Sequence, residues 1–185
     1  MSNAEAPTYK IIEGSLEWAD KYREFCRKAY MATYIRPELG ITKDLFTKEI
    51  FSSPRIIKLF QCYCNRTENH KSWLAVDSNN ELLGVVAADL HPDYCDMKAF
   101  YVKPELRGHG IGHELYSKVL DFAGSLPIQV DVIEYVTETI EMYKHWGFEV
   151  DEAKGTLIYN MVEWPEQARQ AYRAIYMVKP GNVKK

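Results

Sequence analysis

The chain has 185 residues, which is enough for one well-cored domain and too few for two ordinary ones. Its hydrophobic fraction of 46% and charged fraction of 26% exclude an intrinsically disordered protein. The net charge of −3 provides no basic surface for nucleic acid, and no apolar run reaches membrane length. No signal-peptide pattern is recognised, so we expect a cytoplasmic protein whose four cysteines are reduced.

No internal repeat or low-complexity linker divides the chain. We expect residues 1–8 to be disordered or derived from a tag. Residues 9–164 are predicted to form the domain proper, and residues 165–185 an appended helix and tail. Neither cysteine nor histidine spacing predicts a metal site.

In the first third of the chain, residues 9–13 are a candidate strand, and a helix is predicted from near Ser15. A break at Gly40 precedes a second helix from Thr42. The pattern over residues 55–64 fits a helix and a strand equally well. Two helices therefore precede the main run of strands.

From residue 72 the spacing of apolar residues changes to a pattern typical of β-strands. Residues 72–76 and 82–90 are β-prone runs separated by the turn cluster 77–80, which indicates a hairpin. A further strand is predicted over residues 94–102. The remaining elements alternate between helix (110–122, 137–145 and 165–175) and strand (128–133, and a closing pair at 149–153 and 156–162). This order indicates an α/β fold with a sheet of mixed direction.

A glycine-rich turn follows the strand that ends at Val102. Gly108, Gly110 and Gly112 alternate at the start of a predicted helix, where backbone N–H groups can form an anion site suited to phosphate. Arg107 adds a positive charge. The G-x-G-x-G spacing matches neither the dinucleotide fingerprint nor the Walker P-loop. The alternative is that the glycines only make a tight turn.

Residues 100–112 resemble motif A of the GNAT acyl-CoA N-acyltransferase superfamily, V-x-P-x-x-(R/Q)-G-x-G-(I/V)-G, and meet every defining position. Residues 143–148, with Tyr143, Gly147 and Phe148, are similar to the family's Y-x-x-x-G-F element. The resemblance implies a splayed mixed sheet of six to seven strands flanked by about four helices, plus a C-terminal helix. It also implies acetyl-CoA as co-substrate.

The resemblance assigns the cofactor contacts to two segments. The backbone of Phe100, Tyr101 and Val102 would bond the pantetheine amides. The pyrophosphate would lie on Arg107, Gly108, His109, Gly110, Ile111 and Gly112. The family usually has Asn where this chain has Val136, so polar contacts there would fall to the neighbours Thr137, Glu138 and Thr139.

Two residues are proton-transfer candidates. The tyrosine of the family that matches Tyr143 donates a proton to the leaving thiolate, and a tyrosine O–H is neutral at pH 7; the alternative is a core tyrosine. Asp96 occupies the position of a family Glu that acts as general base, and its shorter side chain favours a bridging water; the alternative is a local turn contact. Cys95 as a nucleophile is a further alternative, although a buried thiol is usually inert.

The acceptor is predicted to be a primary amine of a small molecule or peptide. Residues 30–34 and 39–42 resemble the helix-loop region of bacterial polyamine acetyltransferases, and several acidic residues could receive a cation: Glu38, Asp89, Asp93, Asp96 and Glu134. Family members are often dimers, which leaves a homodimer open. Two other hypotheses stand: a non-catalytic acyl-CoA-binding module, motivated by Val136, and a structural or interaction protein.

Overall fold

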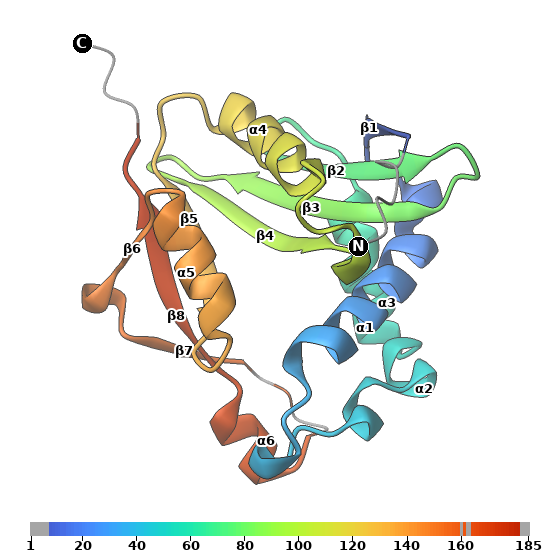
Figure 1. Ribbon diagram of the computed structural model, residues 1–185, viewed down its shortest axis with the longest axis vertical. Coiled ribbons are helices and arrows are strands. Elements are labelled where there is room, and N and C mark those ends of the chain that lie inside the picture. The colour runs from blue at the N-terminus through green and yellow to red at the C-terminus, as the bar shows by residue number, and fades with distance from the viewer. Residues whose placement is uncertain (1–7, 160, 162–163, 182–185) are drawn as a thin grey trace, which may run out of the picture.

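The computed structural model describes residues 8–159, 161 and 164–181. A single mixed sheet runs in the order β1-β2-β3-β4-β5-β8-β6, and β7 also pairs with β8 (Figure 1). The strands are β1 Tyr9–Glu13, β2 His70–Asp77, β3 Leu82–Leu90, β4 Cys95–Val102, β5 Ile128–Ile133, β6 Glu149–Val150, β7 Thr156–Ile158 and β8 Arg173–Lys179. The predicted α/β class with a mixed sheet is confirmed.

Helices cover both faces of this sheet. They are α1 Ala19–Tyr34, α2 Lys48–Phe51, α3 Pro54–Cys64, α4 Ile111–Ala123, α5 Thr137–His145 and α6 Glu166–Ala171. Two buried clusters follow from this arrangement: α1 and α3 pack on one face, and α4 and α5 on the other (Figure 1). Within the described residues, none of these helices combines the length and the apolarity that crossing a membrane requires.

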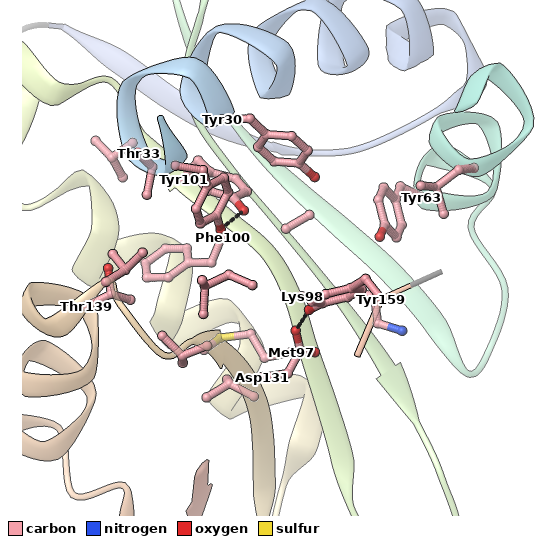
Figure 2. Close-up of a pocket in the computed structure, with 18 of the residues that line it drawn as sticks. Tyr30, Thr33, Tyr63, Met97, Lys98, Phe100, Tyr101, Asp131, Thr139 and Tyr159 are labelled. Carbon is pink, nitrogen blue, oxygen red and sulfur yellow. Dashed lines mark hydrogen bonds between the residues drawn. The ribbon is translucent and has the colours of Figure 1, made fainter. Parts of the chain in front are cut away.

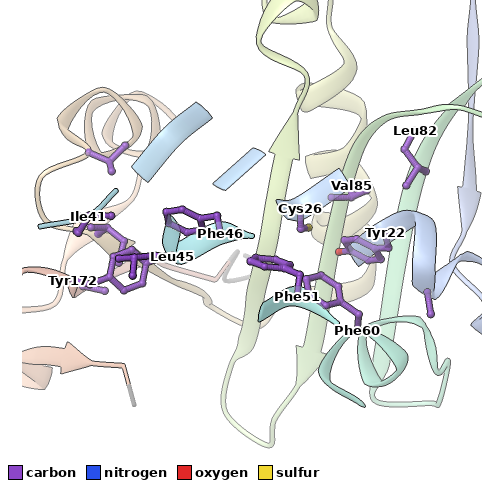
Figure 3. Packing of buried hydrophobic residues seen from close by; sticks show 14 of the residues in the cluster. Tyr22, Cys26, Ile41, Leu45, Phe46, Phe51, Phe60, Leu82, Val85 and Tyr172 are labelled. Atoms are coloured by element: carbon purple, nitrogen blue, oxygen red, sulfur yellow. The ribbon is translucent and has the colours of Figure 1, made fainter. Parts of the chain in front are cut away.

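The first core lies between α1, α3 and the hairpin of β2 and β3. Tyr22 and Cys26 of α1 are fully buried, and the Tyr22 ring meets Phe60 of α3 at 5.8 Å between centroids (Figure 3). The ambiguous stretch 55–64 is thus a helix, and Pro54 stands at its start, where a missing N–H costs nothing.

The second core depends on a close approach of α4 to β3. A Cβ at Gly84 would lie 2.9 Å from Leu115 Cδ1 and 3.1 Å from Ile111 Cγ2. Ile111 and Leu115 are both fully buried. Glycine at this position therefore lets α4 pack directly on the sheet, which fixes the first turn of the helix beside the end of β4.

Strands β4 and β5 are parallel neighbours that part almost at once. Their register covers only Cys95 with Ile128 and Asp96 with Gln129, whereas β3 follows β4 as far as Val102. A β-bulge interrupts the pairing of β4 with β3, and Ala99, which lies within the bulge, has a positive φ of 50°. Strands β4 and β5 diverge beyond Asp96 and Gln129, as the predicted splayed sheet requires.

The C-terminal segment differs from its prediction. The helix ends at Ala171, and β8 then enters the sheet between β5 and β6 with six residue pairs to β5. The β-branched and aromatic residues Ile175, Tyr176 and Val178 favour a strand, and this preference outweighs the helical spacing on which the longer helix was predicted. Strand β8 is therefore part of the sheet, and the last helix is shorter than predicted.

The predicted closing pair of strands also differs. Strands β6 and β7 do not pair with each other; both pair with β8, on the edge away from β5. Strand β7 ends at Ile158, and positions 160 and 162 of the predicted strand lie outside the described residues.

Candidate active site

A cavity of about 1240 Å³ opens where β4 and β5 part. It runs from the loop after β4, past α5, to α1 and α3 on the other face of the sheet. We call the part at β4, the glycine loop and α5 the donor half. The acceptor half is lined by the end of α1, by α2 and α3, and by Asp96 to Lys98, Asp131 and Tyr159.

The glycine loop lies at the mouth of the donor half. Gly108 and Gly110 have φ values of 84° and 88°, and apart from their immediate chain neighbours no described residue has a heavy atom within 4 Å of where their Cβ atoms would be. Gly110 is the N-cap of α4, and the first intrahelical bond runs from the Glu114 N–H to its carbonyl at 3.0 Å. The amides of residues 111–113 precede that bond, so the helix start presents donors to an anion.

The predicted cofactor-binding residues divide into two groups. Nine line the cavity: Phe100, Tyr101, Val102, Arg107, Gly108, Gly110, Gly112, Glu138 and Thr139. Three do not line it: His109 and Thr137 are exposed, and the Ile111 side chain is fully buried under the loop. Ile111 can therefore contribute only its backbone. Val136 lines the cavity as a buried apolar side chain and offers no polar group there.

Tyr143 reaches the cavity from α5 within an aromatic cluster. Its ring lies 5.1 Å from Phe148 and 6.1 Å from Trp146, measured between centroids, and 5% of the residue is exposed. Burial raises the pKa of its hydroxyl well above the usual range, with further contributions from Tyr34 and Asp131. The hydroxyl is therefore a neutral proton donor at neutral pH.

Asp96 belongs to a network of paired charged side chains on the α3 side of the sheet. The Lys98 ammonium lies 3.0 Å from Asp96 Oδ2 and 2.5 Å from Asp89 Oδ2, and His70 pairs with Asp89. Burial lowers the pKa of Lys98, but the two carboxylates raise it by more, so it remains charged. Asp96 Oδ1 is buried and has no hydrogen-bond partner within the described residues.

Asp131 was missed by the sequence analysis. It stands on β5 two residues beyond Gln129, the last residue paired with β4, and lines the cavity where Tyr159 donates a hydrogen bond to its Oδ2 (Figure 2). Burial raises the pKa of its carboxyl group. A lone Asp inside the apolar strand Ile128–Ile133 was the available signal, because a buried carboxylate is costly without a purpose.

The remaining acidic candidates and the candidate nucleophile from the sequence do not line the cavity. Glu134 pairs with Arg173 at 3.1 Å, and Glu38 and Asp93 are exposed and absent from the cavity lining. Cys95 is fully buried away from the cavity, and burial raises its pKa to about 12. A thiol so rarely ionised at neutral pH is not an available nucleophile.

The end of α1 spans the two parted strands. The hydroxyls of Tyr34 and Tyr101 are 2.6 Å apart, which ties α1 to β4. The Tyr135 hydroxyl donates to the Tyr34 carbonyl at 2.9 Å, which ties α1 to the loop after β5. Tyr34 lines the cavity where its two halves meet. The fold thus joins a backbone-lined anion site to a buried acidic chamber, an arrangement suited to moving a group from a phosphate-bearing carrier to an acceptor.

Comparison with known proteins agrees with this class. The model of the acetyltransferase (GNAT) family matches residues 25–148, more than half of the chain, so the chain belongs to that family. It is 25% identical over 129 residues to the uncharacterized N-acetyltransferase YjgM of Escherichia coli, covering 65% of this chain and 74% of that protein. It is 30% identical over 84 residues to the uncharacterized N-acetyltransferase C1271.07c of Schizosaccharomyces pombe. That match spans 43% of this chain and about half, 52%, of the yeast protein.

Solved structures share the fold. A GNAT-family acetyltransferase from Staphylococcus aureus superposes with a TM-score of 0.63 at 16% identity, covering 93% of this chain and 98% of that one. The structure of the PaiA N-acetyltransferase of Thermoplasma acidophilum, determined in complex with coenzyme A, superposes with a TM-score of 0.59 at 19% identity. The match covers 94% of this chain and 99% of that one.

Proposed function

We propose that the protein transfers an acetyl group from acetyl-CoA to a primary amine by direct attack within a ternary complex. The observation that carries this proposal is the single cavity, which runs from the glycine loop, past Tyr143, to the carboxylates Asp96 and Asp131. Donor and acceptor can therefore meet in one chamber without a covalent enzyme intermediate. The exclusion of Cys95 as a nucleophile supports the same route.

The donor half fits acetyl-CoA as co-substrate. The loop amides and Arg107 would hold the pyrophosphate, because positive-φ glycines leave the backbone open to an anion. The unpaired edge of β4 from Phe100 to Val102 faces the cavity beyond the last β5 pair and would bond the pantetheine amides. When bound, acetyl-CoA supplies the thioester carbonyl that the amine attacks.

Two proton transfers complete the reaction. A primary amine with a pKa of about 10 must lose a proton to act as nucleophile, and the departing thiolate must gain one. We assign protonation of the thiolate to the neutral hydroxyl of Tyr143. We assign removal of the amine proton to Asp96 through a water molecule, since Asp96 Oδ2 is held by Lys98 and Oδ1 remains available to accept a hydrogen bond.

A peptide amine and a small-molecule amine both remain within the proposal. The cytoplasmic location and the homodimer predicted from the sequence stay predictions. The non-catalytic acyl-CoA-binding module remains the competing hypothesis, because Val136 leaves that position without a polar group.

The direct test is release of free thiol from acetyl-CoA in the presence of a panel of primary amines, run beside a CoA-dependent shift of the melting temperature. The proposal expects both signals. A melting-temperature shift with no thiol release from any amine would support the binding module instead. Absence of both would contradict acetyl-CoA as ligand.

A further inference from the structure

We infer that the acceptor half takes a primary monoamine with an aromatic or bulky apolar body, an arylalkylamine, with its ammonium group on Asp131. This inference rests on the proposed function and names its substrate class. Three features of the acceptor half carry it: a carboxylate that makes no ion pair among the described residues, a continuous aromatic wall, and an exposed lysine of α3.

Among the described residues of the acceptor half, Asp131 is the carboxylate that makes no ion pair. Asp96 and Asp89 share Lys98, and Asp89 also pairs with His70. Among the described residues Asp131 makes no ion pair and is held by the neutral hydroxyl of Tyr159. Its charge also raises the pKa values of Tyr34, Tyr63 and Tyr143, so its field reaches the proposed proton donor as well as the chamber. An ammonium group would provide the missing counter-charge.

The aromatic wall consists of Tyr30, Phe51, Phe60 and Tyr63, all of which line the cavity. Consecutive rings of this wall are 5.8, 6.5 and 5.5 Å apart between centroids, and they come from α1, α2 and α3. Figure 2 shows Tyr30 and Tyr63 reaching into the space from the helical side, opposite Asp131 and Tyr159. Such a wall favours an apolar or aromatic body and also attracts a cation beside it.

The charges at the outer end argue against two other kinds of amine. Lys58 of α3 lines this part of the cavity, and among the described residues of this half the only other carboxylate in the lining, Asp96, is paired with Lys98, so the second ammonium of a polyamine would meet a cation and no second counter-charge. An amino acid would place its α-carboxylate beside the amine and therefore close to Asp131 and Asp96, which repel it. A monoamine without an adjacent carboxylate avoids both penalties.

The test uses three probes with the full-length protein: phenethylamine, phenylalanine and putrescine. Binding of each to the protein saturated with CoA is measured by calorimetry, and turnover is measured with acetyl-CoA. We expect phenethylamine to bind at least tenfold more tightly than the other two and to have the highest kcat/KM. Equal or tighter binding of putrescine or phenylalanine would overturn the inference. Selective phenethylamine binding with no thiol release would uphold the inference and contradict the proposed function.

A pair of variants locates the ammonium group. Asp131→Asn is expected to weaken phenethylamine binding at least tenfold and to leave CoA binding unchanged. The control is Asp121→Asn, which removes an exposed carboxylate of α4 and should change neither. Unchanged phenethylamine affinity in Asp131→Asn would also overturn the inference.

Discussion

The two halves of the cavity are made of different parts of the polypeptide. The donor half is largely backbone: the glycine loop, the first amides of α4 and the free edge of β4. The acceptor half is made of side chains brought together from six separate elements or loops, among them Asp96 on β4, Asp131 on β5 and Tyr63 on α3. A backbone site binds a chemically constant group, whereas a side-chain site can differ from one relative to the next.

The largest effect is expected where the halves meet. Tyr143→Phe removes the proposed proton donor, so kcat should fall by about 100-fold with little change in either KM. Steady-state kinetics with acetyl-CoA and an accepted amine measure this.

Tyr116→Phe is the matched control for that substitution. The Tyr116 hydroxyl is buried without a hydrogen-bond partner in the described structure, its ring stacks on Trp146 at 4.6 Å, and it does not line the cavity. Removing this hydroxyl should leave kcat unchanged. Equal losses in the two variants would mean that Tyr143 acts only through packing.

Asp96→Asn tests the acceptor half and should lower kcat by about 30-fold near pH 7. Without a base, the rate depends on the small free-amine fraction, which rises about tenfold per pH unit below the amine pKa of about 10. The variant should therefore recover activity steeply as the pH rises. Asp93→Asn, an exposed carboxylate outside the cavity, is the control. A variant profile parallel to that of the native protein would exclude Asp96 as base.

Gly110→Ala tests the donor half alone. An L-residue at a φ of 88° costs about 1–2 kcal/mol and shifts the amides at the start of α4, so the KM for acetyl-CoA should rise about tenfold. The KM for the amine should not change. Gly155→Ala imposes a comparable strain at a φ of 66° outside the cavity and serves as control. A rise in both KM values would show that the halves are not independent.

The two halves of the cavity also differ in how far the sequence predicts them. The donor half was predicted because Gly108, Gly110 and Gly112 lie within six residues of Arg107 and their spacing is itself the site. In the acceptor half, Asp131 and Tyr159 are 28 positions apart and meet only because β5 and the segment after β7 fold together. Strand β8 was missed for a similar reason: its first three residues were predicted as the end of a helix and the rest as a tail, because its partners β5, β6 and β7 are separate segments of the sequence.

The smallest expected effect is on stability, through the network of charged side chains that contains Lys98. Burial lowers the pKa of His70, but Asp89 and the Tyr63 carbonyl raise it by more. The resulting stabilisation is present in full below the unfolded pKa of about 6.5 and is lost as the pH rises through the folded value. The melting temperature should fall by a few degrees over that range.

His70→Gln should remove this part of the pH dependence and leave the KM for acetyl-CoA unchanged. His145→Gln, an exposed histidine on α5, should leave the dependence intact. A pH dependence that survives in His70→Gln would assign it to another group.

The central claim is that donor and acceptor meet in one cavity without an acetylated enzyme. Initial rates measured while both acetyl-CoA and phenethylamine are varied test it most directly, because a ternary complex gives intersecting double-reciprocal lines. We predict intersecting lines and no acetyl group on the protein, by mass spectrometry, after incubation with acetyl-CoA alone. Parallel lines together with a covalently acetylated protein would contradict the account.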